Sequence, residues 1–235
     1  MFSIERFTSY FPKIIAKFPV TLGIVLVSFA CGIILGLCFA LIRLKKLPVV
    51  SQVVAVLVSY IRCTPPITQL FVVYFGLPIL LRSLGVDTTN VAKVVYVYVA
   101  FGLNQAGFLS EVMRSSILAV PSGQTEAGLS VGLTGGQTFF TIVVPQALRI
   151  AMPMLGTAFV YLFQGTALAY MVGVMDMIGK ARSIAAIRGH LLEGYLCAAC
   201  VFIVISLILE NVFKRLNMHL DFSSDSLRAK KVNNA

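Results

Sequence analysis

Charged residues are scarce in this sequence. Asp, Glu, Lys and Arg make up 12% of the 235 residues, whereas 58% are hydrophobic and the mean hydropathy is +0.93. A soluble domain carries about 25% charged and about 45–50% apolar residues, so this shortage excludes that class and indicates an integral membrane protein. The charges that are present divide the chain into long apolar blocks, at residues 20–42, 47–61 continued after Arg62 by 63–81, 94–110, 150–175 and 194–209.

The apolar blocks have the length of membrane-spanning helices. A hydrocarbon core about 30 Å thick takes roughly 20 helical residues, which each block reaches with help from its flanks. A spanning backbone must satisfy its own hydrogen bonds, and the blocks lack the alternating pattern of barrel strands. The sequence therefore predicts an all-α, multi-pass membrane protein with about five transmembrane helices. The block at 20–42 is too long for the apolar core of a signal peptide, so we expect it to be retained.

Groups that perform covalent chemistry or bind metals are also missing from the sequence. There is no Walker-type phosphate loop, and His190 and His219 have no Cys, His, Asp or Glu cluster at ligand spacing. Cys197 and Cys200 have redox spacing but lie in an apolar helix, which favours packing. The net charge of +10 falls between the apolar blocks and in the tail, where it indicates topology. We expect no enzyme activity, cofactor or metal in this chain, and no nucleic-acid partner.

The two ends of the chain differ from the apolar blocks. Residues 1–19 interleave Phe, Ile and Tyr with Lys and Arg, which is typical of an amphipathic helix lying at a membrane surface. Residues 20–216 form the predicted transmembrane domain, and residues 217–235 form a basic tail. Basic residues follow both the first and the last block, so with five spans we expect these ends in the cytoplasm and the N-terminus outside. The other basic residues fall on both sides, so charge alone does not settle the topology.

Residues 125–149 carry no charge between Glu126 and Arg149, yet they are a poor candidate for a further span. Glycines at 128, 132, 135 and 136 and interspersed hydroxyl side chains leave membrane insertion marginal at best. Pro121 suits a helix start, Gly132 suits the left-handed residue that closes a helix, and Thr134 suits the N-cap of the next helix. Pro145 would kink or end that second helix. We predict a cytoplasmic helix–Gly–helix hairpin over residues 121–145; an ordinary re-entrant or surface loop is the alternative.

The spacing in this hairpin resembles the loop shared by ABC importer permeases. That pattern is E-A-A, three residues, G, nine residues, I, one residue, L-P, and Glu126-Ala127-Gly128, Gly132, Ile142 and Val144-Pro145 meet every spacing. Gly128 replaces the second alanine and Val144 replaces the leucine. "RCTPPITQLFVVYFGLP" and "SEVMRSSILAVPSGQTEA" are similar to segments of the type I importers for polar amino acids, the histidine and glutamine permease type. The resemblance covers residues 20–216.

The resemblance implies a permease subunit in the bacterial inner (plasma) membrane. Its helix around Glu126, Ala127 and Gly132 would be the coupling helix that docks on a cytosolic ATPase. Gly132 would supply the tight turn, and the small residues Ala127 and Gly128 would allow close approach to the ATPase. Pro145 is the last residue of the family pattern. ATP and Mg would be used by an ATPase dimer, and an extracytoplasmic binding protein would deliver the substrate.

The resemblance further implies a polar amino acid as substrate, with cystine and basic amino acids as candidates, and a second permease subunit. The lysine–acidic pair that the subfamily carries in its fourth span is missing from "PMLGTAFVYLFQGTALAYMVGVMD", which slightly favours a heterodimer over a homodimer. A stand-alone secondary transporter is the alternative function. It predicts internal repeats, and the two halves of this chain show no convincing repeat.

Polar residues within the apolar blocks are the candidates for a substrate pathway, because such residues usually face the bundle interior or a cavity. These residues are Arg62, Thr64, Gln69, Asn104, Gln105 and Gln164. Arg62 would either line the pathway or neutralise a structural partner. For the amides, hydrogen bonding between helices is favoured over a pathway role. Glu111 and Arg114, at i and i+3, predict a local ion pair near the inner interface.

Overall fold

The computed structural model describes residues 4–187 and 189–220, and every regular element in these ranges is a helix. The α-helices are α1 (Ile4–Ile15), α2 (Phe18–Leu44), α3 (Val50–Cys63), α4 (Pro66–Phe71), α5 (Leu77–Ser83), α6 (Lys93–Leu118), α7 (Ser122–Ser130), α8 (Gly135–Thr138), α9 (Val144–Gly165), α10 (Met177–Ile187) and α11 (Leu191–Leu220). Two π-helical segments, Val72–Gly76 and Phe139–Val143, and a 3-10 segment, Thr166–Val172, lie between them. The predicted all-α class is confirmed. Of the predicted basic tail, only residues 217–220 are described, as the end of α11.

Four helical stretches are long and apolar enough to cross a membrane. They are Phe18–Leu44, Pro66–Ser83, Gly135–Val172 and Leu191–Met218. The block at 94–110, predicted as a further span, forms most of α6 but is not among the four, because Asn104 and Gln105 lower its hydropathy. With 26 residues α6 is nevertheless about 39 Å long, which exceeds the hydrocarbon thickness.

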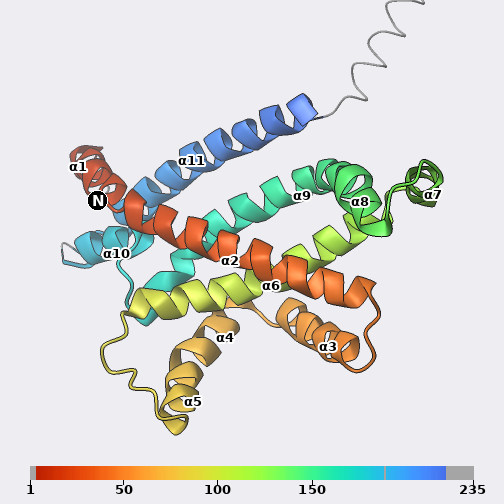
Figure 1. Ribbon diagram of the computed structural model, residues 1–235. Coiled ribbons are helices and arrows are strands. Elements are labelled where there is room, and N and C mark those ends of the chain that lie inside the picture. The colour runs from red at the N-terminus through yellow and green to blue at the C-terminus, as the bar shows by residue number, and fades with distance from the viewer. Residues whose placement is uncertain (1–3, 188, 221–235) are drawn as a thin grey trace, which may run out of the picture.

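Helix α6 is the centre of the bundle. It contacts α2 along its length and also packs against α3, α4 and α9, while α9 in turn packs against α11 (Figure 1). Small residues allow the closest of these contacts: a β-carbon added at Gly32 of α2 would lie 2.5 Å from Cβ of Gln105 on α6. The polar middle of α6 is therefore held directly against α2.

The N-terminal segment forms the predicted amphipathic helix, α1, and its apolar face is covered by protein. Tyr10 and Ile14 are fully buried in the main core, where α1 contacts α10 and α11. The described charged side chains of α1, Glu5 and Lys13, are exposed. The position of α1 relative to the membrane surface stays a prediction.

The second apolar block is not continuous, contrary to the sequence-based expectation. Helix α3 ends at Cys63, and Thr64 adopts an extended conformation with φ −106° and ψ 141°. Pro65 is also extended, with ψ 141°, before α4 begins at Pro66. A residue that precedes proline is disfavoured in the helical region, and here two residues in succession precede a proline. Arg62 therefore lies near the end of a short helix.

Candidate functional site

The hairpin after α6 has the predicted local structure. Helix α7 begins at Ser122 directly after Pro121, and Gly132 has the left-handed φ of +87° that closes it. Thr134 forms a complete capping box: its Oγ1 accepts from the backbone N–H of Gln137 at 3.3 Å, and its own N–H donates to Oε1 of Gln137 at 2.8 Å. Figure 1 shows α7 standing apart from the long helices, beyond the end of α6.

The second half of the hairpin does not end at Pro145, which corrects one of the two predicted outcomes, a stop at this residue. Helix α8 continues through the π-helical segment Phe139–Val143 directly into α9, which starts at Val144 and runs to Gly165. The backbone N–H of Val144 reaches back five residues to the carbonyl of Phe139. This wider turn interrupts the regular i to i−4 hydrogen bonds immediately before Pro145. Pro145 then lies in the first turn of α9, where its missing N–H is tolerated.

Gly128 corrects a second expectation about this loop. Its small size was expected to allow close approach to a partner, but Gly128 is buried against Thr138 and Ile142 of the same chain. Glu126 and Ala127 are exposed on α7. The surface available to a partner is therefore formed by Glu126, Ala127 and their exposed neighbours.

Two features of the loop were missed by sequence reasoning. Gln146 in the first turn of α9 donates to the side-chain oxygen of Gln124 on α7 at 3.2 Å and to the carbonyl of Ile142 at 3.1 Å. The tip of the loop also exposes a large apolar side chain, Val131, which is 77% accessible. Val131 follows the end of α7, and Leu129 in the last turn of α7 is also exposed, so the end of this helix offers apolar surface to a partner.

Glu111 is the centre of an ion cluster. Its predicted pair with Arg114 is confirmed, with Nη2 2.8 Å and Nε 3.2 Å from Oε2. Arg43, from the last turn of α2, bonds to the other oxygen, Oε1. Nη1 of Arg62 lies 4.0 Å from the same Oε1, which is beyond hydrogen-bond distance. Both oxygens of Glu111 are thus occupied by other arginines, and Arg62 contributes positive charge beside them.

A cavity of about 890 Å³ lies between α6 and α9, next to this cluster. Of the predicted pathway residues it brings together Arg62, Asn104 and Gln105. Glu111 also lines it, and the walls include aromatic side chains such as Phe108 and Tyr161. Oε1 of Gln105 is buried and has no hydrogen-bond partner in the described part of the chain. Arg62 therefore lies near Glu111 and also lines a cavity, and its role in a substrate pathway stays a prediction.

Gln69 and Thr64 are outside this cavity and have a structural role at the break between α3 and α4. Nε2 of Gln69 donates to the carbonyl of Ile61 at 2.5 Å, to the carbonyl of Thr64 at 3.1 Å and to Oγ1 of Thr64 at 2.7 Å. Its Oε1 accepts from Nδ2 of Asn104 at 3.0 Å. These contacts match the favoured expectation of hydrogen bonding between helices.

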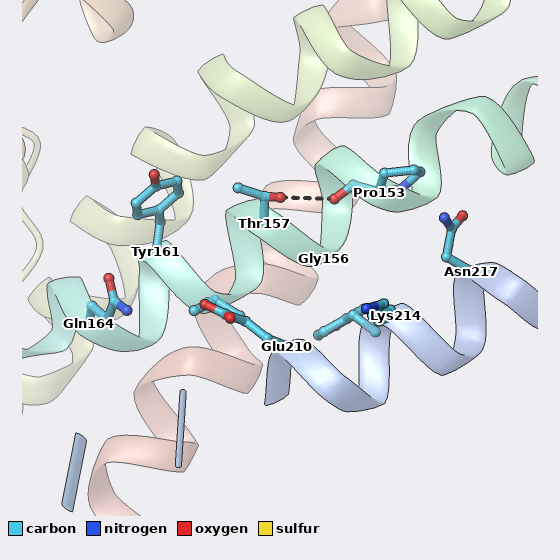
Figure 2. A pocket seen from close by; sticks show the side chains of 10 residues that line it. Pro153, Gly156, Thr157, Tyr161, Gln164, Glu210, Lys214 and Asn217 are labelled. Atoms are coloured by element: carbon cyan, nitrogen blue, oxygen red, sulfur yellow. Dashed lines mark hydrogen bonds between the residues drawn. The ribbon is translucent and has the colours of Figure 1, made fainter. Parts of the chain in front are cut away.

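Gln164 belongs to a different region, the groove between α9 and α11. Its Nε2 donates to Oγ of Ser206 at 3.3 Å. Figure 2 shows Gln164 on α9 and, facing the same groove of about 550 Å³, Glu210 and Lys214 on α11. Among residues 4–187 and 189–220, no group of three or more His, Cys, Asp or Glu side chains is placed to hold a metal ion.

Comparison with known proteins gives consistent results. Residues 32–221 match the family described as "Binding-protein-dependent transport system inner membrane component". The chain is 35% identical over 213 residues to the L-cystine transport system permease protein TcyL of Bacillus subtilis (strain 168), covering 91% of this chain and 89% of that protein. It is 28% identical over 209 residues to the glutamine transport system permease protein GlnP of Escherichia coli (strain K12), covering 89% and 93%.

Solved structures share the fold. The crystal structure of an amino acid ABC transporter with histidines contains a chain that superposes with a TM-score of 0.82 at 24% identity, covering 93% of this chain and 99% of that one. An inward-facing MetNI methionine ABC transporter superposes with a TM-score of 0.71 at 18% identity, covering 89% and 96%.

Proposed function

Since this chain belongs to the inner membrane component family of binding-protein-dependent transport systems, we propose that it is the permease subunit of an ATP-driven importer for a polar amino acid, with cystine as the leading candidate. The family makes it a multi-pass inner-membrane protein. The cystine assignment is supported by the 35% and 34% identity to the two cystine permeases of Bacillus subtilis. The family match favours this function over a stand-alone secondary transporter.

The observation that carries the proposal is the geometry of the hairpin. Helix α7 is joined to the bundle through α6 and α9, and its Glu126 and Ala127 are exposed. We infer that this helix docks on a cytosolic ATPase that uses ATP and Mg, so that hydrolysis takes place in that subunit. An extracytoplasmic binding protein delivers the amino acid, and a second permease, which we favour as a different polypeptide, completes the pore.

We propose that the cavity between α6 and α9 is the half of the substrate pathway that this chain contributes. Arg62 offers a guanidinium group that can bind a carboxylate in a bidentate manner. Gln105 also lines the cavity, and its unpaired side-chain oxygen, which is covered in this structure, could accept from an ammonium group once the side chain turns toward the cavity. All free amino acids share a carboxylate and an ammonium group, so this arrangement suits amino acids as a substrate class. Selection among their side chains is left to the binding protein.

The proposal is tested with the complete transporter in proteoliposomes, loaded with ATP and supplied with the binding protein outside. We expect ATP-dependent uptake of labelled cystine above that of glutamine and arginine, and two permease polypeptides in the purified complex. Uptake without the ATPase would overturn the importer assignment. A single permease polypeptide at 1:1 with the ATPase would overturn the heterodimer.

Gly132→Asp tests the coupling role of the loop. The substitution places a charged side chain at the turn, where an added β-carbon meets no neighbouring atom, but where the φ of +87° disfavours any L-residue by about 1–2 kcal/mol. We expect normal membrane insertion, continued ATP hydrolysis and loss of uptake. Normal uptake by this variant would contradict the coupling role.

A further inference from the structure

Gly128 and Thr138 make an unusually close contact within the hairpin. A β-carbon added at Gly128 would lie 2.6 Å from Cγ2 and 2.9 Å from Oγ1 of Thr138, and 3.0 Å from Cδ1 of Ile142. The first two distances are shorter than real β-carbons tolerate, so the side chain of Thr138 occupies the space that an alanine methyl group would need. Thr138 is itself fully buried.

The other glycines of the hairpin do not share this property. A β-carbon at Gly132, Gly135 or Gly136 would meet no atom within 4 Å. The importer pattern has alanine at the position of Gly128, so the glycine in this chain is a departure from the pattern that Thr138 explains. The two residues are therefore matched to each other in shape.

The shape of its side chain, rather than a hydrogen bond, explains why a threonine occupies position 138. Its Oγ1 is buried without a hydrogen-bond partner in the described part of the chain. An unpaired buried hydroxyl is unfavourable, so this residue gains nothing from its polarity here. What its branched side chain provides is a rigid group with a strongly restricted χ1 that fills the hollow over Gly128.

The contact joins α7 to the start of the helix that lines both cavities. Thr138 directly precedes the π-helical segment Phe139–Val143, in which Val143 is buried against Val120 and Ala147. Helix α9 follows without a break and supplies Met154 and Tyr161 to the cavity that α6 also lines. Gly128 thus contacts α8 and the π-helical segment, which lead without a break into α9.

We propose that Gly128 and Thr138 are positioning residues, whose interlocking contact sets the angle of α7 against α9 and transmits movement of α7 into the bundle. This inference rests on the proposed function of α7 as the docking helix. The hydrogen bond between exposed Gln124 and half-buried Gln146 links α7 to the first turn of α9, and it lies apart from the fully buried contact of Thr138 with Gly128.

The test is a double-mutant cycle on the complete transporter, read as amino acid transported per ATP hydrolysed. Gly128→Ala improves helix propensity, so local helix stability alone predicts a neutral or stabilising change. Overpacking of the contact predicts the opposite, and we expect the transport-to-hydrolysis ratio to fall roughly tenfold, equivalent to about 1.4 kcal/mol. Co-purification of the ATPase stays at the level of the unmodified complex.

Thr138→Ala in the Gly128→Ala background removes both clashing atoms, and we expect it to restore most of the ratio, with Thr138→Ser restoring less. Thr138→Ala alone leaves a hollow and lowers the ratio by a smaller factor, which keeps the test informative if Gly128→Ala does not insert. Gly136→Ala is the matched control, because it adds the same methyl group where there is space, and it should behave like the unmodified protein.

The outcomes separate the two proposals. An unmodified complex that lacks an ATPase or transports no amino acid contradicts the proposed function. An active unmodified complex in which Gly128→Ala keeps its ratio overturns the positioning role. Failure of Thr138→Ala to improve an impaired Gly128→Ala complex also overturns it, because the contact would then not be the cause of the loss.

Discussion

Prolines interrupt this bundle in two different ways, at Pro65 and at Pro145. At Pro65 the chain leaves the helix, and Thr64 and Pro65 are both extended with ψ 141°. At Pro145 the chain stays helical, because a π-helical segment ends two residues earlier. Pro78 follows the second pattern, since the other π-helical segment, Val72–Gly76, also ends two residues before it.

The two sites show two ways of satisfying the backbone beside a proline. Pro65 removes the N–H that would bond to the carbonyl of Ile61, and Nε2 of Gln69 takes its place. A side chain thereby makes a complete break tolerable in a buried region. At Pro145 the backbone itself adjusts by the wider turn, and Nε2 of the adjacent Gln146 donates to the carbonyl of Ile142 at 3.1 Å.

The largest effect is expected for Gln69→Leu. It leaves the carbonyl of Ile61 and the amide of Asn104 buried without their partner, and each such group costs about 1–3 kcal/mol. We expect the free energy of unfolding of the purified transporter in detergent to fall by about 2–3 kcal/mol. Gln164→Leu is the matched control; it removes one bond of 3.3 Å between helices and should cost about 0.6 kcal/mol. Equal losses for the two variants would refute the special role of Gln69.

Thr64→Val is expected to have an intermediate effect. The change keeps the shape of the side chain but removes the Oγ1 that accepts from Gln69 and donates to the carbonyl of Tyr60. Gln69 keeps its bonds to the carbonyls of Ile61 and Thr64, so we expect a loss of about 1 kcal/mol in the same unfolding measurement. A loss as large as that of Gln69→Leu would mean that the hydroxyl, rather than the carbonyls, holds the break.

Pro145→Ala is expected to have the smallest effect on stability. The π-helical segment already accommodates the ring, so the main change is greater freedom of the unfolded chain, which costs about 0.4–1 kcal/mol. Pro78→Ala should change the free energy of unfolding by a similar amount, because it follows the same pattern. A clear difference between these two variants in thermal unfolding would show that the two π-helical segments are stabilised by different contacts.

The local features of the hairpin could be predicted from the sequence because they depend on neighbours along the chain. The turn at Gly132 and the N-cap at Thr134 each involve residues within one helical turn or one loop, as does the pair of Glu111 with Arg114 in α6. The pattern from Glu126 to Pro145 likewise indicated the family, because it consists of spacings. The end of the helix that was considered at Pro145 was wrong, since a proline signal does not reveal a preceding π-helical turn.

The contacts that complete the site join residues far apart in the chain. Arg43 is one of the basic residues after the first apolar block, which were assigned only to topology, because nothing in its sequence context points to Glu111, 68 positions away. Gly128 was expected to contact a partner, and only the packed loop shows that Thr138 fills the space beside it.

The sequence by itself thus determined the membrane class, the local form of the hairpin and the family, because hydropathy, helix signals and spacing are properties of the chain. Only the tertiary structure decided which helices meet, and with them the Glu111 cluster, the cavity between α6 and α9 and the Gly128–Thr138 contact. These depend on side-chain shape and on the closeness of backbones, which are settled only when the bundle packs.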